Sequence, residues 1–379
     1  MSAVAPVLTV PFNRATTAIK SYDYVRDVLD HGPLAGGGPY SKRCEALIAS
    51  QMQAQAALLT SSCTDALEMS ALLLNIAPGD EVIIPSFTFS STATAFTLRG
   101  AVPVFADIRP DTMNIDETKI EDLITCRTKA IVVVHYAGVG CEMSSISSIA
   151  SAHNIPILED NAHGLYGTYR GQQLGTIGSL GTQSFHETKN LSCGEGGALV
   201  INDIAYLNRA EILREKGTNR SRFFRGEVDK YTWIDNGSSY LPSEITAALL
   251  LAQLEEASSI QEKRRNLWEA LFDGIGPWAD RLGIQMPHVP SHCEQAFHMF
   301  YLVMPSEKAQ VDLKKHLASR GVLAVTHYVP LHSSPYGVAV GRGECPISDD
   351  ISARLLRLPF FTDMSMEEFE VVVDAVTSG

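Results

Sequence analysis

Seven short runs of apolar and β-branched residues between residues 56 and 202 are the feature that most constrains the fold. Stretches with helical spacing or helix-forming composition separate them, among them residues 63–74, 91–100 and 144–154. This alternation is typical of a mostly parallel β-sheet covered by helices on both faces. The seven predicted strands are residues 56–60, 81–86, 102–107, 130–135, 155–160, 182–186 and 197–202.

A second pattern begins near Pro242, after which a serine cap opens a long predicted helix over residues 243–271. The pattern then predicts a strand over 296–305, a helix over 308–321, a strand over 322–330 and a final helix over 365–376. A chain of 379 residues is long for one domain. We therefore expect a large domain of residues 1–250 and a smaller C-terminal α/β domain of residues 251–379.

Charge and cysteine content exclude several classes of function. A net charge of −13 disfavours binding to nucleic acid and to anionic membranes. The seven cysteines form no CxxC pair and, with the histidines, show no zinc-ligand spacing, so no metal is expected. Scattered cysteines and the absence of a signal sequence predict a cytoplasmic protein. One basic run, residues 216–226, is either a phosphate clamp or a solvated loop.

Polar residues follow several predicted strands, where ligands collect in parallel α/β sheets. In Thr60–Glu68, small hydroxyl residues open a helix, which is either a phosphate site or an ordinary N-cap. Glu159 and Asp160 end a buried strand, where a carboxylate needs a cation or another donor. His163 is either a ligand contact or a satisfied loop histidine.

Lys189 lies after a predicted strand and before the glycines of GEGG, beside Ser184 and His186. A partly desolvated lysine becomes a neutral amine that attacks carbonyls. Phe87 and Phe89 end another strand and belong either to the core or against a flat ring. A phosphate, a planar ring with a protonatable nitrogen and an aldehyde together describe pyridoxal 5'-phosphate (PLP).

These residues occur in motifs that resemble the DegT/StrS family of PLP-dependent nucleotide-sugar aminotransferases over nearly the whole chain. The motifs are SSCTDAL, GDEVIIPSFTFSSTA, FADIRPDTMNID, HYAGVGCEM, EDNAHG, SFHETKN with GEGGAL, and HYVPLHSSPY. The resemblance implies the aspartate aminotransferase fold (PLP fold type I), with a mostly parallel seven-stranded sheet in the large domain. It also implies a homodimer with active sites at the interface.

Carried over to this sequence, the resemblance implies that Lys189 forms a Schiff base with PLP and that Asp160 pairs with the ring nitrogen. His163, whose position is occupied by glutamine in many members, stands near the ring hydroxyl. Phe89 stacks on the ring. The phosphate is held by Cys63, Thr64 and Ser184. Ser239 stands at the position of an asparagine that in many members reaches the phosphate bound by the neighbouring subunit.

Residues 214–241 resemble the members that aminate dTDP-4-keto-6-deoxy-D-glucose with L-glutamate as donor, in the biosynthesis of lipopolysaccharide and enterobacterial common antigen. Candidate substrate contacts are Arg220, Arg225, Lys230 and His332. The presence of Lys189 favours transamination over the dehydration of related members that carry histidine. Two alternatives stay open: another nucleotide-linked keto sugar, with a C3 keto group or a gluco product, and a PLP-binding regulator without catalysis.

Overall fold

The computed structural model describes residues 10–379, so the first nine residues of the predicted large domain lie outside it. Its centre is a seven-stranded sheet in the order β1-β9-β8-β5-β4-β2-β3. Only β9 runs antiparallel to its neighbours in this sheet, which confirms the predicted mostly parallel arrangement. The strands are β1 Ala56–Thr60, β2 Glu81–Pro85, β3 Val102–Ala106, β4 Thr128–Val134, β5 Ile157–Asp160, β8 Leu180–Ser184 and β9 Gly197–Ile201.

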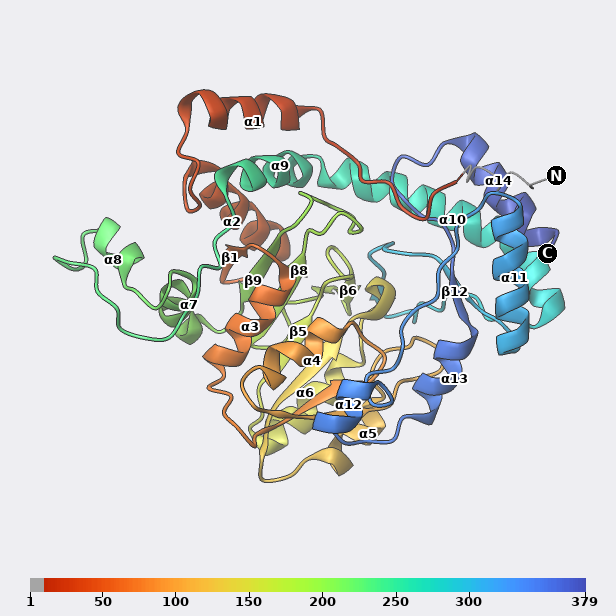
Figure 1. The fold of residues 1–379 in the computed structure, drawn as a ribbon, viewed down its shortest axis with the longest axis horizontal. Coiled ribbons are helices and arrows are strands. Elements are labelled where there is room, and N and C mark those ends of the chain that lie inside the picture. Colours follow the sequence, from red (N-terminus) through yellow and green to blue (C-terminus); the bar gives the residue numbers. More distant parts are fainter. Residues whose placement is uncertain (1–9) are drawn as a thin grey trace.

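Helices cover both faces of this sheet (Figure 1). Alternate residues of a strand enter different cores: Val82 and Ile84 pack in the core with α3 and α4, whereas Ile83 packs with α5 and α6. This is the period of two expected for a strand buried on both faces. The helices of this part are α1 Lys20–His31, α2 Pro39–Met52, α3 Cys63–Leu73, α4 Ser90–Thr97, α5 Glu117–Leu123, α6 Met143–His153, α7 Leu207–Arg214, α8 Arg220–Phe224 and α9 Glu244–Glu255.

The C-terminal part packs around the long helix α10, Ala257–Leu282. A two-stranded antiparallel sheet of β11 (Tyr301–Val303) and β12 (Leu355–Arg357) lies in the same core. The other elements of this part are α11 Glu307–Ser319, α12 Pro335–Val340, α13 Pro346–Arg354 and α14 Met366–Thr377. A small sheet of β6 (Thr168–Tyr169), β7 (Gln172–Gln173) and β10 (Cys293–Glu294) joins residues from both predicted domains.

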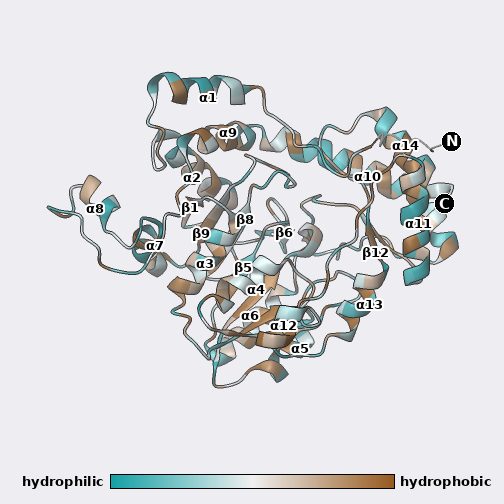
Figure 2. Cartoon of the chain, in the orientation of Figure 1, coloured by the Kyte–Doolittle hydropathy of each residue, from teal (hydrophilic) through white to brown (hydrophobic). Residues whose placement is uncertain are grey.

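Figure 2 shows the hydrophobic residues concentrated on the strands and on the faces of the helices that touch them. A residue of the C-terminal part also contacts the large sheet: the N–H of Phe105 in β3 donates to the carbonyl of Arg342 at 2.8 Å.

The predicted boundary near residue 250 falls inside α9, which packs on α1 and α2. The division into two domains stays a prediction.

Two sequence-based predictions about the C-terminal part are wrong. The helix predicted over 243–271 is two helices, because the backbone leaves helical geometry at Glu256 (φ −98°, ψ 6°). The strand predicted over 322–330 does not form. Within it only Val322 and Val325 make single β-bridges, to Val10 and Arg357, because the following residues turn their side chains into the cavity described below.

Candidate active site

A cavity of about 570 Å³ opens at the carboxyl ends of the parallel strands. It is lined by residues from the strand ends, from the start of α3 and from the C-terminal part of the chain. Seven of the predicted site residues meet there, although they are far apart in the sequence: Cys63, Thr64, Phe89, Asp160, His163, Ser184 and Lys189. The predicted grouping of strand ends is therefore correct.

Lys189 lies in the loop between β8 and β9 and lines this cavity. Its backbone N–H donates to the carbonyl of His186 at 2.9 Å, which closes the turn that carries it. Within residues 10–379, its ammonium makes no hydrogen bond and no ion pair. Burial lowers the pKa of Lys189 to about 8. A substantial fraction of neutral amine is therefore available near neutral pH.

Asp160 ends β5 and is buried in the same cavity. The hydroxyl of Thr92 donates to its Oδ2 at 2.7 Å, and the N–H of Ala162 donates to its Oδ1 at 3.2 Å. Burial raises the pKa of Asp160, while these two hydrogen bonds and the nearby Lys189 charge oppose the rise. A buried carboxylate with so few donors around it can still accept a hydrogen bond from a protonated ligand nitrogen.

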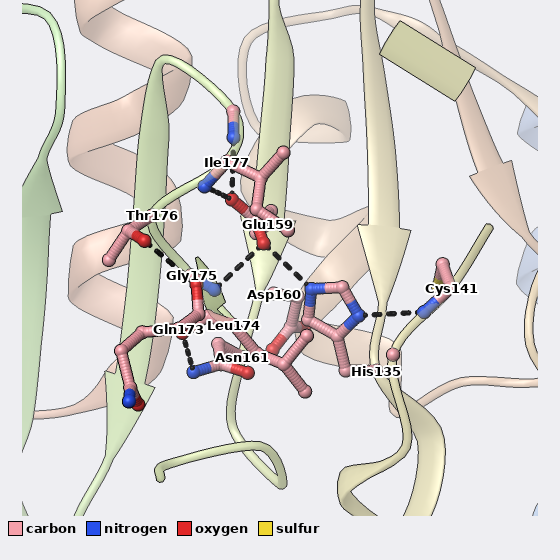
Figure 3. Close-up of polar contacts among 12 residues, drawn as sticks. His135, Cys141, Glu159, Asp160, Asn161, Gln173, Leu174, Gly175, Thr176 and Ile177 are labelled. Carbon is pink, nitrogen blue, oxygen red and sulfur yellow. Dashed lines mark hydrogen bonds and ion pairs between the residues drawn. The ribbon is translucent and has the colours of Figure 1, made fainter. Parts of the chain in front are cut away.

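Glu159 precedes Asp160 in the strand and points to the other face of the sheet (Figure 3). Its carboxylate is fully enclosed, and it accepts hydrogen bonds from the N–H groups of Gly175, Ile177 and Gly178 at 2.6–2.7 Å. His135 Nε2 lies 2.8 Å from it. These contacts anchor the loop between β7 and β8, so Glu159 has a structural role.

The start of α3 forms one wall of the cavity. The side chain of Ser62 caps this helix by accepting from the N–H of Asp65 at 3.1 Å. The predicted N-cap is therefore present, and Cys63 and Thr64 occupy the first helical positions, where free N–H groups favour an anion. Gly197 of β9 permits this approach, because a Cβ there would lie 2.4 Å from the N atom of Cys63.

The structure separates the two phenylalanines whose roles were open. Phe87 is fully buried in a core cluster with Tyr136 and Met299. Phe89 is 59% exposed and lines the cavity, where its ring is free to stack on a ligand. His163 is buried, and its ring stacks on that of His298 with centroids 4.4 Å apart.

The sequence analysis predicted none of the cavity residues that come from the C-terminal part of the chain. They are His298, His327, Tyr328 and Arg357. The rings of His327 and Tyr328 lie against each other, with centroids 3.4 Å apart. The motif HYVPLHSSPY contains two of these residues, His327 and Tyr328, but its first four residues were predicted to belong to a strand.

Five other predicted residues do not line this cavity within one chain. His332 Nδ1 lies 2.7 Å from the Ser86 hydroxyl, and its Nε2 lies 3.3 Å from Asp349. Arg225 pairs with Glu211 and Glu227 near the projecting helix α8 (Figure 1). The remaining three lie in the same region, at Arg220, Lys230 and Ser239.

Comparison with known proteins identifies this arrangement. The model of the DegT/DnrJ/EryC1/StrS aminotransferase family matches residues 17–377. The chain belongs to this family. It is 32% identical to the spore coat polysaccharide biosynthesis protein SpsC of Bacillus subtilis, over 97% of this chain and 96% of that protein.

Solved structures of similar proteins agree with the family assignment. The aminotransferase TlmJ of Streptoalloteichus hindustanus superposes with a TM-score of 0.89 at 27% identity, covering 97% of this chain and 98% of that one. DesV of S. venezuelae, solved with a ketimine intermediate, gives a TM-score of 0.86 at 30% identity, with the same coverage of 97% and 98%. The fold is therefore PLP fold type I, and the chain is a PLP-dependent sugar aminotransferase.

The cavity of this aminotransferase fits PLP on its own geometry. Asp160 is an incompletely paired carboxylate for the ring nitrogen, and Lys189 is an unpaired amine for the aldehyde. His163 Nδ1 is buried without a partner in residues 10–379, so it can meet a polar group of the ring. The start of α3 suits the phosphate. Thus each functional group of PLP has a complementary group in the cavity.

Two absences are relevant to this enzyme. Throughout residues 10–379, no group of three or more histidine, cysteine, aspartate or glutamate side chains is placed to hold a metal ion. In the same residues, no helix has both the length and the apolar character needed to cross a membrane.

Proposed function

We propose that this enzyme transfers the amino group of L-glutamate to C4 of dTDP-4-keto-6-deoxy-D-glucose, giving dTDP-4-amino-4,6-dideoxy-D-galactose and 2-oxoglutarate. The observation that carries the transaminase chemistry is the buried, unpaired Lys189 amine, with its pKa lowered to about 8, in one cavity with Asp160. The choice of sugar is supported by residues 214–241, which resemble the members that act on this substrate.

Each residue of the cavity has a defined task in this reaction. PLP, when bound, supplies an electron sink for the bond broken at the substrate carbon. Asp160 holds a proton on the ring nitrogen, because its buried carboxylate makes no ion pair within residues 10–379 and is free to pair with a protonated ligand nitrogen. Lys189 takes a proton from the carbon that bears the donor nitrogen and returns it at the cofactor, as general base and then general acid.

The remaining contacts orient the reactants. The first N–H groups of α3 and the hydroxyls of Thr64 and Ser184 hold the phosphate. Phe89 covers the ring from the open side of the cavity. His163 is held as a neutral imidazole, because burial places its pKa well below the usual range, so it can donate or accept one hydrogen bond at the ring hydroxyl.

We further propose a homodimer in which the segment around α8 completes the site of the partner. This segment projects from the body of the chain (Figure 1) and exposes the side chains of Phe224, Tyr231 and Trp233. Large exposed apolar side chains of this kind favour coverage by a second surface. In such a dimer, Arg220, Arg225 and Lys230 serve the partner's nucleotide, and Ser239 its cofactor phosphate.

The dimer proposal can be tested by subunit complementation. Lys189→Ala and Arg225→Glu each lack one part of the proposed site. If the arginine acts across the interface, mixing the two inactive or weakened proteins restores activity in the heterodimer. Arg225→Glu alone raises the KM for the nucleotide sugar. A monomer by light scattering, or no recovery with proven heterodimer, contradicts the proposal.

The substrate is tested by incubating the holoenzyme with L-glutamate and dTDP-4-keto-6-deoxy-D-glucose, followed by NMR of the aminosugar. We expect an axial amino group at C4 of the product. An equatorial group, or turnover of only a C3 keto sugar, establishes the alternative sugar aminotransferases. Lys189→Ala is the inactive control. If no amino donor bleaches the yellow colour of the holoenzyme, the PLP-binding regulator without catalysis is supported instead.

A further inference from the structure

Arg357 is a cation in the cavity that has no carboxylate partner within residues 10–379. It ends β12 and lines the cavity together with Lys189 and His163. Its side chain makes one hydrogen bond in these residues, to Nε2 of His327 at 3.3 Å, and its Nε is buried without a partner. Most N–H donors of this guanidinium are therefore available to a ligand.

Two aromatic side chains hold this guanidinium in place. The ring of Phe12 lies against it, with 4.7 Å between Cζ and the ring centroid. His327 accepts from it at Nε2, so the proton of this neutral imidazole is on Nδ1, from which it donates to the Tyr136 hydroxyl at 3.1 Å. Burial also lowers the pKa of His327 well below its usual range, in agreement with the neutral ring.

Arg264, which is also buried, shows how a structural arginine differs. It donates to the carbonyls of Phe297 and His298 at 2.9 and 2.7 Å and to the hydroxyl of Thr362 at 3.1 Å. Its donors are thus used within the protein. A buried guanidinium that keeps its donors free, as Arg357 does, is costly without an anionic ligand.

We infer that Arg357 binds the carboxylate next to the amino group of the amino donor. The planar guanidinium matches a carboxylate in a bidentate geometry. This carboxylate is one bond from the carbon that Lys189 deprotonates, and Arg357 is close enough to Lys189 for its charge to contribute, after burial, to the lowered pKa of the lysine. The inference rests on the proposed amino-acid donor.

The keto sugar cannot use this subsite in the same way. Its diphosphate is attached to C1, across the ring from the reacting C4, so the phosphates lie several bonds farther from Lys189 than a donor carboxylate does. Arg357 therefore acts in one half of the reaction only. Its loss must affect the two substrates unequally.

The test compares Arg357→Gln and Arg357→Lys with Arg320→Gln, a control that removes an arginine paired with Asp374 on the surface. Rapid-mixing absorbance gives kcat/KM for glutamate with the holoenzyme and for the keto sugar with the aminated form. We expect Arg357→Gln to lower the value for glutamate by about 100-fold, which corresponds to two charge-assisted hydrogen bonds. We expect Arg357→Lys to restore part of the kcat/KM for glutamate. The kcat/KM for the keto sugar should stay within about threefold of wild type in both variants.

Binding of glutarate, an unreactive dicarboxylate, to the holoenzyme gives a second readout by calorimetry. Its Kd rises in Arg357→Gln and is unchanged in Arg320→Gln. Unchanged kinetics with glutamate, or a loss that falls equally or mainly on the keto sugar, overturns the inference and in the latter case assigns Arg357 to the nucleotide phosphates.

The wild-type enzyme separates this inference from the proposed function. If glutamate does not convert it but another amino acid does, the proposed donor is wrong and the same comparison is made with the active amino acid. If no amino acid converts it, both proposals are contradicted.

Discussion

Glu159 and Asp160 are adjacent carboxylates at the end of β5, yet their surroundings differ. Glu159 is enclosed by three backbone N–H groups and His135, whereas Asp160 has one hydroxyl and one backbone N–H. Adjacent strand residues point to opposite faces, so one side chain enters the protein core and the other the cavity. The comparison teaches that incomplete pairing, more than burial, marks the functional carboxylate.

The largest expected effect is that of Asp160→Asn. An amide cannot hold the ring nitrogen protonated, so we expect kcat to fall by about 1000-fold, the magnitude typical of losing a key electrostatic contact. Because burial raises the pKa of Asp160, its charge is unfavourable to the fold, and the apo-protein should not lose thermal stability. Steady-state kinetics and calorimetry of the same sample check both results.

The reverse pattern is expected for Glu159→Gln. Its carboxylate satisfies several buried donors, so the variant should lose about 3 kcal/mol of stability. The kcat of the folded fraction should stay near the wild-type value, because the side chain does not line the cavity. Thermal unfolding and active-site titration measure the two quantities. A Glu159 variant that is stable but inactive would reverse the comparison.

The reactivity of Lys189, which lines the same cavity as Asp160, can be tested by its dependence on pH. Only the neutral amine attacks an aldehyde, so the rate of covalent attachment of PLP to the apo-protein rises with pH until it levels off above the lysine pKa of about 8. Between pH 6 and pH 8 the increase should be about 50-fold. Absorbance stopped-flow gives the midpoint.

The same measurement on the two carboxylate variants sharpens the comparison. The Asp160 charge raises the pKa of Lys189, so Asp160→Asn should move the midpoint to lower pH. Glu159→Gln should leave it unchanged. A midpoint near the ordinary lysine value of 10.5 would remove the desolvated amine from the mechanism.

The smallest effect is expected for Thr92→Val, which deletes the hydroxyl bonded to Asp160 Oδ2. Loss of this bond raises the pKa of Asp160 further. We expect kcat to fall about fivefold, the cost of one hydrogen bond of about 1 kcal/mol. Thr97→Val in the same helix is the control, since within residues 10–379 its hydroxyl bonds only to the backbone of Thr94. Equal losses in both variants would indicate a general effect on α4.

Local sequence determined the sheet and the half of the site carried by it. Each of the seven predicted strands is present. Asp160 and Ser184 end two of them and Lys189 follows the second, all at one edge of the sheet, because the ends of parallel strands converge whatever their separation in the chain. These features depend on short-range hydrophobic patterns that a sequence displays directly.

The tertiary structure alone decided which residues close the other half. Arg357 and His298 carry no local signal, and they become site residues only because the C-terminal part packs against the strand ends. His332 lies in a recognisable motif, yet its ring is occupied by Ser86 and Asp349. Periodicity cannot show whether a polar group finds its partner inside the protein. That depends on contacts between residues distant in the chain, and it separates Asp160 from Glu159.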